Sequence, residues 1–251
     1  MSVDIVYHQA FVALPSSLCG GEPVRGVLGQ VEKRLGEVCA SGKKAPLMIF
    51  LPGSNPRGQE QMMADWIVEE LGFILIAPNT HAQIDRPSYV SPADPSIYDL
   101  VHKLRREEVS HVMDKIAEFD CIDRRFVVLA GLSEGAVAAA TWHGDGITAR
   151  MVLAWNCEPS YYIDKVDIAG DPDETPVLNL NGYHDEFFGP HAELGKPYGV
   201  AGHGSAALQA FKRAKVIIYP SAGHRVLDHP EARHDILQFL KYWRDYFLSK
   251  N

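Results

Sequence analysis

The sequence has no apolar stretch that approaches the ~20 residues needed to cross a membrane, and it has no Cys-x-x-Cys pair. Its first residues also lack the basic start and the continuous apolar run of a signal peptide. The cysteines are few and scattered along the chain, at Cys19, Cys39, Cys121 and Cys157. We therefore expect a cytoplasmic protein whose thiols are reduced and have structural roles.

Positive charge is also scarce, because 24 Lys and Arg residues stand against 32 Asp and Glu, for a formal net charge of -8. A negative surface repels the phosphate backbone of nucleic acids and anionic lipids. The spacing of His224, His229 and His234 does not bring them to one face of a helix, as a helical metal site requires. We expect no nucleic acid or membrane partner, and no metal or other cofactor.

Short apolar runs that alternate with helical patterns dominate the chain from about residue 45 onward. The runs predict six buried strands, at 45–51, 73–77, 126–130, 151–155, 177–180 and 216–219. Helical spacing recurs at 58–71, after a proline-rich loop at about 80–96, and at 231–248. Continuously apolar strands belong in a parallel sheet covered on both faces, and parallel neighbours need crossover helices. The sequence thus predicts an α/β fold with a mostly parallel, doubly wound sheet flanked by helices.

Residues 1–44 are less regular, and their structure stays open within a single domain that spans residues 1–251. A run at 7–14 could be an opening strand, and a stripe of valines and leucines at 24–38 fits a helix in spite of several glycines. With 46% hydrophobic residues, the chain has enough apolar material for one core. The N-terminal segment could shape substrate access or the formation of a homo-oligomer.

One motif carries chemistry: the strand at 126–130 runs directly into Gly131-Leu-Ser133-Glu-Gly135, and small residues follow. A serine on a sharp strand-to-helix turn needs glycine on both sides, because the strand and the helix crowd these positions. The turn lifts the hydroxyl above the sheet edge and directs the first N–H groups of the helix toward it. The pattern predicts Ser133 as a nucleophile for acyl transfer.

A serine nucleophile needs a general base, and the base needs a group that orients it. Among the 11 histidines, His224 is favoured because it comes just after the last strand, at 216–219. Loops beyond the carboxyl ends of parallel strands are where catalytic groups collect. His81 and His184 lie in loops near the same edge and are candidates for substrate contact.

The orienting acid should follow the end of another strand. Asp185 does so after the strand at 177–180, where its carboxylate could hold the imidazole in one tautomer. Glu186 is adjacent in sequence, and Glu158 follows the strand at 151–155, so both remain rivals. We favour Asp185.

The order serine, acid, histidine resembles that of the α/β-hydrolases, and within them the compact dienelactone-hydrolase-like and small-esterase group. The resemblance covers the chain from about residue 45 to its end. It rests on Gly131-Leu-Ser133-Glu-Gly135, Gly182-Tyr-His-Asp185 and Gly223-His224. It implies the α/β-hydrolase fold without a large cap domain.

The resemblance also implies an oxyanion hole made by the backbone N–H groups of Ser54 and Glu134. Pro52-Gly53-Ser54 looks like the oxyanion loop of the family, although proline stands at position 52 where histidine is more usual. True dienelactone hydrolases use a cysteine nucleophile, whereas this chain has Ser133. That departure argues against dienelactone hydrolysis itself.

The predicted function is that of a serine hydrolase that cleaves a carboxylic ester of a small molecule through an acyl-enzyme. A thioesterase, an acyltransferase or a small peptidase could use the same triad, and a non-catalytic binding protein is a further alternative. The loops expected to line the pocket contain arginine and aromatic residues, namely Arg57, Arg86, Tyr89, Trp155, Tyr161, Tyr162, Phe187, Phe188 and Tyr198.

Overall fold

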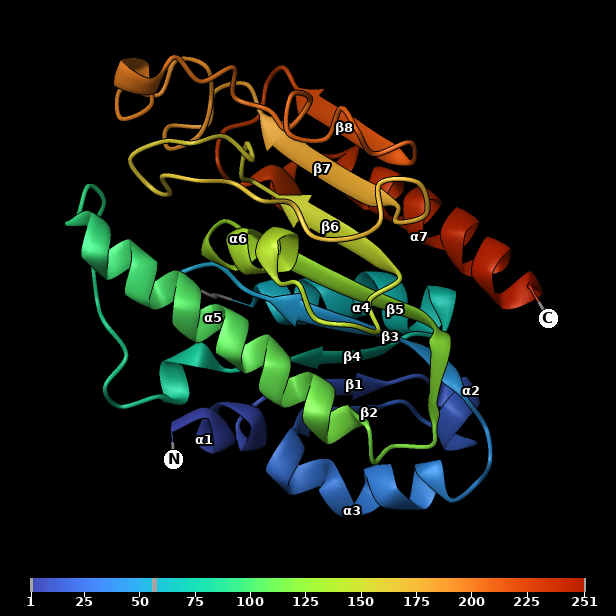
Figure 1. Ribbon diagram of the computed structural model, residues 1–251. Helices are drawn as coiled ribbons and strands as arrows, with labels where there is room; N and C mark the ends of the chain where they lie inside the picture. Colours follow the sequence, from blue (N-terminus) through green and yellow to red (C-terminus); the bar gives the residue numbers. More distant parts are fainter. Residues whose placement is uncertain (1, 56–57, 251) are drawn as a thin grey trace.

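The computed structural model describes residues 2–55 and 58–250, and its strands form one mixed sheet (Figure 1). The strands are β1 (Phe11–Leu14), β2 (Val24–Val27), β3 (Ala45–Leu51), β4 (Ile74–Ala77), β5 (Ile122–Leu132), β6 (Ala149–Leu153), β7 (Val177–Gly182) and β8 (Ala214–Tyr219). The order across the 8-stranded sheet is β2-β1-β4-β3-β5-β6-β7-β8. From β4 to β8 all neighbours are parallel, and β1 is antiparallel to both β2 and β4. The expected mostly parallel sheet is confirmed.

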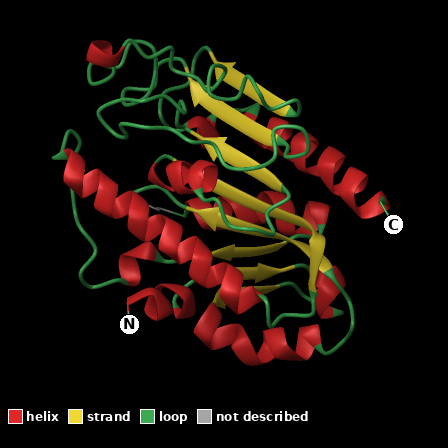
Figure 2. Ribbon diagram, in the orientation of Figure 1, coloured by secondary structure: helices red, strands yellow, loops and turns green. Residues whose placement is uncertain are grey.

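Helices cover both faces of this sheet (Figures 1 and 2). They are α1 (Ser2–His8), α2 (Ser16–Cys19), α3 (Leu28–Cys39), α4 (Gln59–Leu71), α5 (Pro95–Ile116), α6 (Glu134–Thr141) and α7 (Ala232–Ser249), with short 3-10 turns η1 (Thr80–Ala82), η2 (Lys196–Tyr198) and η3 (Val226–Asp228). Helices α4 and α7 pack on one face, and α1, α3, α5 and α6 pack on the other. The sheet is therefore doubly wound, as expected.

Strand β3 shows why the apolar runs are continuous. All of its residues are buried, because alternate side chains enter different layers of the core. Met48 and Phe50 pack with α4 and α7, whereas Leu47 and Ile49 pack with α3 and α5. A strand covered on both faces has no polar side to alternate with its apolar one.

Helix α5 begins where local sequence signals require it. Asp94 is the N-cap, and its carboxylate accepts a hydrogen bond from Ser96 N at 2.9 Å. Pro95 occupies the first helical position, where its missing N–H costs no hydrogen bond. The helix then crosses the sheet face beside α6 (Figure 1). As a result, the middle turns of α5 lie next to the loop that follows β3.

The N-terminal segment supplies two strands at the edge of the sheet. The run at 7–14 is divided, because α1 ends at His8 and β1 starts at Phe11, opposite Ala77 of β4. The helix expected over 24–38 begins only at Leu28, and the residues before it form β2. Over four residues the valines of β2 fit the spacing of a helix as well as that of a strand. The strand forms because this segment pairs with β1.

The cysteines differ from expectation. Cys39, at the end of α3, and Cys121, just before β5, form a disulfide with a Cα–Cα distance of 4.4 Å. The expectation that all thiols are reduced is wrong for this pair, which lies 82 residues apart in sequence. Cys19 and Cys157 are free. The spacing of the cysteines gave no sign of this pairing, because the two residues meet only through the packing of α3 against the start of β5.

The carboxyl ends of the parallel strands meet beneath a group of long loops (Figure 2). Residues 154–176 connect β6 to β7, and residues 183–213 connect β7 to β8, with no helix longer than the turn η2. Within the described part of the chain, no cap domain is inserted between strands. The same residues contain no helix that is both long and apolar enough to cross a bilayer.

Candidate active site

Ser133 occupies the turn between β5 and α6, in a backbone conformation that few residues other than glycine adopt. Its φ is 53° and its ψ is -115°. Such a conformation costs about 1–3 kcal/mol and persists only where neighbouring structure enforces it. Ser133 N donates to Leu153 O at 2.8 Å, and Ser133 O accepts from Ala136 N at 2.9 Å. The turn is thereby fixed to β6 on one side and to α6 on the other.

The glycines of the motif are required by close backbone approach. A Cβ on Gly131 would overlap the main chain of Gly135, and a Cβ on Gly135 would overlap the carbonyl group of Leu51. The start of α6 therefore lies directly against β3 and β5. This is the crowding that the sequence motif predicts.

His224 and Asp185 are brought to Ser133 by the loops after β8 and β7. Ser133 Oγ lies 2.9 Å from His224 Nε2, and His224 Nδ1 lies 2.8 Å from Asp185 Oδ2. A carboxylate can only accept, so Nδ1 carries the proton and Nε2 is left to accept from the serine hydroxyl. The structure thus joins the three residues in one line of hydrogen bonds.

The carboxylate of Asp185 is itself held in place. It is 2% exposed, and its Oδ1 accepts from the backbone N–H groups of Phe187 at 2.8 Å and Phe188 at 3.0 Å. The rings of these two residues flank the imidazole of His224, with centroids 4.8 and 5.7 Å from it. Both the acid and the imidazole therefore have one defined orientation.

The rival acids face elsewhere. Glu158 accepts from Ala201 N and Gly202 N, each at 2.8 Å, and so fixes the loop between β7 and β8. Glu186 accepts a hydrogen bond from the backbone N–H of His224 at 3.3 Å, and the imidazole of that residue is bonded to Asp185 instead. Neither carboxylate takes the place of Asp185.

A cavity of about 320 Å³ opens in front of Ser133. Its apolar wall comes from Met62, Leu132 and Leu227, and its other lining residues are Gly53, Ser54, Asn55, Gln59, Ser133, His224, Arg225 and Asp228. A second cavity of about 650 Å³ also reaches Ser54 and Asn55. It is largely polar and is lined further by His81, Gln83, Arg86, Ser88, Tyr89, Val90, Ser91 and Phe187.

The two loop histidines have different surroundings. His81 lines the second cavity, and burial, followed by the charge of Arg86, lowers its pKa. His184 lies in a separate hollow beside Asp185 and His191. His81 therefore remains a candidate for substrate contact. His184 does not line the cavity in front of Ser133.

The loop after β3 approaches the nucleophile closely. A Cβ on Gly53 would lie 3.4 Å from Ser133 Cβ, and Ser54 lines the same cavity as Ser133. The side chain of Gln59 accepts a hydrogen bond from Gly53 N at 3.0 Å. The N–H of Gly53 is thus occupied, and Ser54 is the next backbone donor along the loop.

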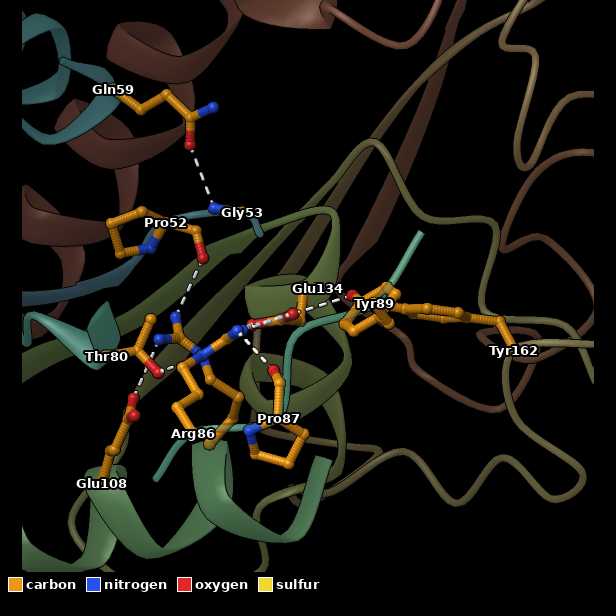
Figure 3. Close-up of polar contacts among 11 residues, drawn as sticks. Pro52, Gly53, Gln59, Thr80, Arg86, Pro87, Tyr89, Glu108, Glu134 and Tyr162 are labelled. Atoms are coloured by element: carbon orange, nitrogen blue, oxygen red, sulfur yellow. Dashed lines mark hydrogen bonds and ion pairs between the residues drawn. The ribbon is translucent and has the colours of Figure 1, made fainter. Parts of the chain in front are cut away.

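Glu134 has a second feature that the motif does not reveal. Its side chain is fully buried, and Arg86 Nη2 donates to both carboxylate oxygens, at 2.6 and 2.7 Å (Figure 3). Tyr89 OH donates to the same carboxylate at 2.8 Å. Burial would raise the pKa of Glu134, but Arg105 and Arg86 together hold it below its usual value. The residue after the nucleophile is therefore an anion enclosed by cations.

The remaining residues expected in the pocket divide by position. Arg57 lies outside the described residues. Arg86 lines the second cavity, and most of its N–H groups are already bonded to Glu134, Thr80 and the Pro87 carbonyl. Trp155, Tyr162 and Phe188 belong to a buried aromatic cluster, with Tyr161 partly buried against it, and Tyr198 is exposed. Tyr89 and Phe187 line the second cavity.

Metal-ligating side chains are not gathered anywhere in the described chain. Across residues 2–55 and 58–250, no group of three or more His, Cys, Asp or Glu residues is placed to hold a metal ion. The acids and histidines at the end of the sheet instead form the hydrogen bonds given above.

Comparison with known proteins supports the architecture. No protein-family model and no curated protein matches the chain. The esterase PE8 is 16% identical with a TM-score of 0.54, covering 80% of this chain and 94% of that one. A Klebsiella pneumoniae protein named "Putative Dienelactone Hydrolase" is 18% identical with a TM-score of 0.52, covering 82% and 88%. TT1662 from Thermus thermophilus is 19% identical with a TM-score of 0.54, covering 80% and 90%. At these identities the likeness shows a shared fold.

Proposed function

We propose that this chain, which has the α/β-hydrolase fold, is a serine hydrolase that cleaves a carboxylic ester of a small molecule. The observation that carries the proposal is the line of hydrogen bonds from Ser133 Oγ to His224 Nε2, and from His224 Nδ1 to Asp185. A nucleophile, a base and an orienting acid in that order, opening on a cavity, are what acyl transfer requires.

The reaction would proceed in two halves. His224 Nε2 takes the proton of Ser133 as Oγ attacks the ester carbonyl, and Asp185 stabilises the imidazolium that forms. The backbone N–H groups of Ser54 and Glu134 receive the oxyanion, where each donor is worth about 3 kcal/mol. His224 then protonates the leaving alcohol. Water, activated by the same imidazole, attacks the acyl-enzyme and releases the acid and the free serine.

The cavities suggest how an ester would lie. The cavity of about 320 Å³ in front of Ser133 has room for a short apolar chain against Met62 and Leu227. The polar cavity of about 650 Å³ beyond Ser54 would take the other side of the ester. We therefore propose a small ester with one short apolar arm and one polar arm.

Replacement of the nucleophile tests the proposal. Ser133→Ala should abolish turnover of p-nitrophenyl acetate and labelling by a fluorophosphonate probe, while the circular dichroism spectrum stays that of the wild type. Ser221→Ala is a matched control, because Ser221 Oγ also lies near an imidazole nitrogen, 3.4 Å from His229 Nε2, without belonging to the line above. Full labelling of Ser133→Ala would refute the assignment.

A series of activated esters tests the substrate. Acetyl to octanoyl p-nitrophenyl esters should show a maximum of kcat/KM at short acyl chains, because the cavity in front of Ser133 is small and only one of its walls is apolar. Thioesters of the same acyl groups compare the leaving group directly. Equally poor turnover of every ester would contradict the simple-esterase proposal.

A further inference from the structure

The Pro52–Gly53 peptide group, which precedes Ser54, has both of its polar atoms held by side chains. Arg105 Nη2 donates to Pro52 O at 2.9 Å, and Gly53 N donates to Gln59 Oε1 at 3.0 Å. Figure 3 shows the bond between Gly53 and Gln59, and a second dashed line that ends at the carbonyl oxygen of Pro52. A peptide plane bonded at its carbonyl and at its N–H cannot rotate without breaking one of these bonds. The direction of the chain entering Ser54 is therefore set by side chains from α5 and α4.

The side chain of Arg105, which holds the Pro52 carbonyl, is charged and yet fully buried. The residue comes from the middle of α5, and its side chain is 0% exposed. Its Nη1 lies 2.9 Å from a carboxylate oxygen of Glu108, one turn further along the helix, and its Nε lies 3.7 Å from Glu134. The guanidinium thus contacts two buried carboxylates and one main-chain carbonyl. Nη2 is hydrogen-bonded to that carbonyl, whereas Nε and Nη1 have carboxylates as ion-pair neighbours and no hydrogen-bond partner among the described residues. The ammonium of a lysine, a single point of charge, cannot face three groups in this way.

The same cluster also reaches the second proposed oxyanion donor. Glu134 supplies its backbone N–H at the start of α6, while its carboxylate is bonded to Arg86 and lies near Arg105. The loop after β3 and the first residue of α6 are therefore both attached to one ion cluster. A shift of Arg105 would therefore displace the backbone N–H groups of both Ser54 and Glu134.

Burial of ionisable side chains such as Arg105, Glu108 and Glu134 is a poor way to gain stability. Desolvation of an ion costs several kcal/mol, and well-packed apolar residues often serve stability equally well or better. A polar cluster in this position is better explained by the geometry it imposes on the loop and the helix.

We infer that Arg105 is a positioning residue for the oxyanion hole. Through Pro52 O and Glu134 it sets the distance and the orientation between the loop carrying Ser54 and the start of α6. The inference rests on the proposed function. It assigns the hole's geometry to a residue of α5 that touches neither substrate nor Ser133.

The test compares Arg105→Met and Arg105→Lys with the wild type. Arg106→Met is the matched control, since Arg106 is the next residue of α5 and lies 3.5 Å from Thr141 rather than near the loop. We expect Arg105→Met to lower kcat for p-nitrophenyl acetate by about 10- to 100-fold, because loss of a whole donor costs about 10²–10³-fold and displacement is a partial loss. KM should change by less than about threefold, and Arg105→Lys should recover part of kcat.

Two further measurements separate positioning from folding. The rate of fluorophosphonate labelling should fall in parallel with kcat, because phosphonylation also places charge in the oxyanion hole. Circular dichroism and urea unfolding show which variants are folded. If Arg105→Met is unfolded, the same changes in kcat, KM and labelling rate are measured for Arg105→Lys and Glu108→Gln.

The outcomes distinguish the inference from the function on which it rests. Folded Arg105 variants with wild-type kcat and labelling, or with a loss confined to KM, overturn the positioning role and leave Ser133-dependent hydrolysis intact. Wild-type protein without Ser133-dependent turnover or labelling overturns both. A loss of kcat in Arg106→Met equal to that in Arg105→Met would also overturn the inference.

Discussion

Asp185→Asn tests the line of hydrogen bonds most sharply, because it changes the charge of the side chain without changing its size. Oδ1 of Asp185 accepts two backbone N–H groups, so the amide oxygen of asparagine must take its place. The NH₂ group then faces His224 Nδ1, which lies 2.8 Å from the other carboxylate oxygen in the wild type. An NH₂ group only donates, so Nδ1 must accept and the ring proton moves to Nε2.

The size of the effect follows from this change of tautomer. A protonated Nε2 cannot take the proton of Ser133, whose Oγ lies 2.9 Å away. Catalysis then depends on the disfavoured tautomer, and a loss of about 10⁴-fold in kcat, or about 5 kcal/mol, is the expected cost. KM should change by less than about threefold, since the cavity in front of Ser133 is lined by other residues.

Steady-state kinetics with p-nitrophenyl acetate measures this loss, and the two rival acids provide the controls. Glu186→Gln should lose less than about tenfold, because Glu186 contacts only the backbone N–H of His224. Glu158→Gln should also keep most of its activity, since Glu158 bonds to the loop at 201–202. Asp185→Asn with more than a tenth of wild-type kcat, or Glu186→Gln as impaired as Asp185→Asn, would refute the reasoning.

Three further predictions concern the frame around the site. Gly135→Ala should lower the free energy of unfolding in urea by about 3 kcal/mol, because the added Cβ would overlap the main chain of β3. Gly36→Ala is the control: no atom lies within 4 Å of the added Cβ, so this change should be neutral or slightly stabilising. Burial lowers the pKa of His102 from 6.5 to about 4, so the unfolded state binds more protons than the folded state between these two pH values. The free energy of unfolding should therefore fall by about 3 kcal/mol as the pH drops from 6.5 to 4. Urea titrations should show that His102→Phe largely removes this fall. The double variant Cys39→Ala/Cys121→Ala should lose about 4 kcal/mol, because the disulfide closes a loop over 82 residues; thiol titration of denatured, unreduced wild type giving four free thiols would contradict the pairing.

The sheet illustrates how far local pattern determines this fold. The strand expected at 45–51 is β3 with the same bounds, because seven consecutive buried residues leave no competing periodicity. The two N-terminal strands were less well predicted: β1 is only the second half of the run at 7–14 that could be a strand, and β2 was expected to be helical. Each has four residues and owes its conformation to pairing at the sheet edge. Short edge strands carry too few residues to establish a period.

The residues of the candidate site were predictable for a different reason. Ser133 belongs to a local motif, and Asp185 and His224 follow strand ends that a parallel sheet must bring to one edge. Topology alone therefore gathers them, without knowledge of any side-chain contact. The sequence left Glu158 and Glu186 open as acids, and the distances favour Asp185.

What the sequence by itself determined is the doubly wound sheet and the position of three polar residues along it, because period and chain order encode both. Only the tertiary structure decided the partners of the buried charges. Glu134 was noted for its backbone, and Arg105 was not noted at all, since a guanidinium on a helix far along the chain has no local sign that it meets a loop carbonyl. Contacts between side chains distant in sequence arise from packing, and packing depends on the whole chain at once.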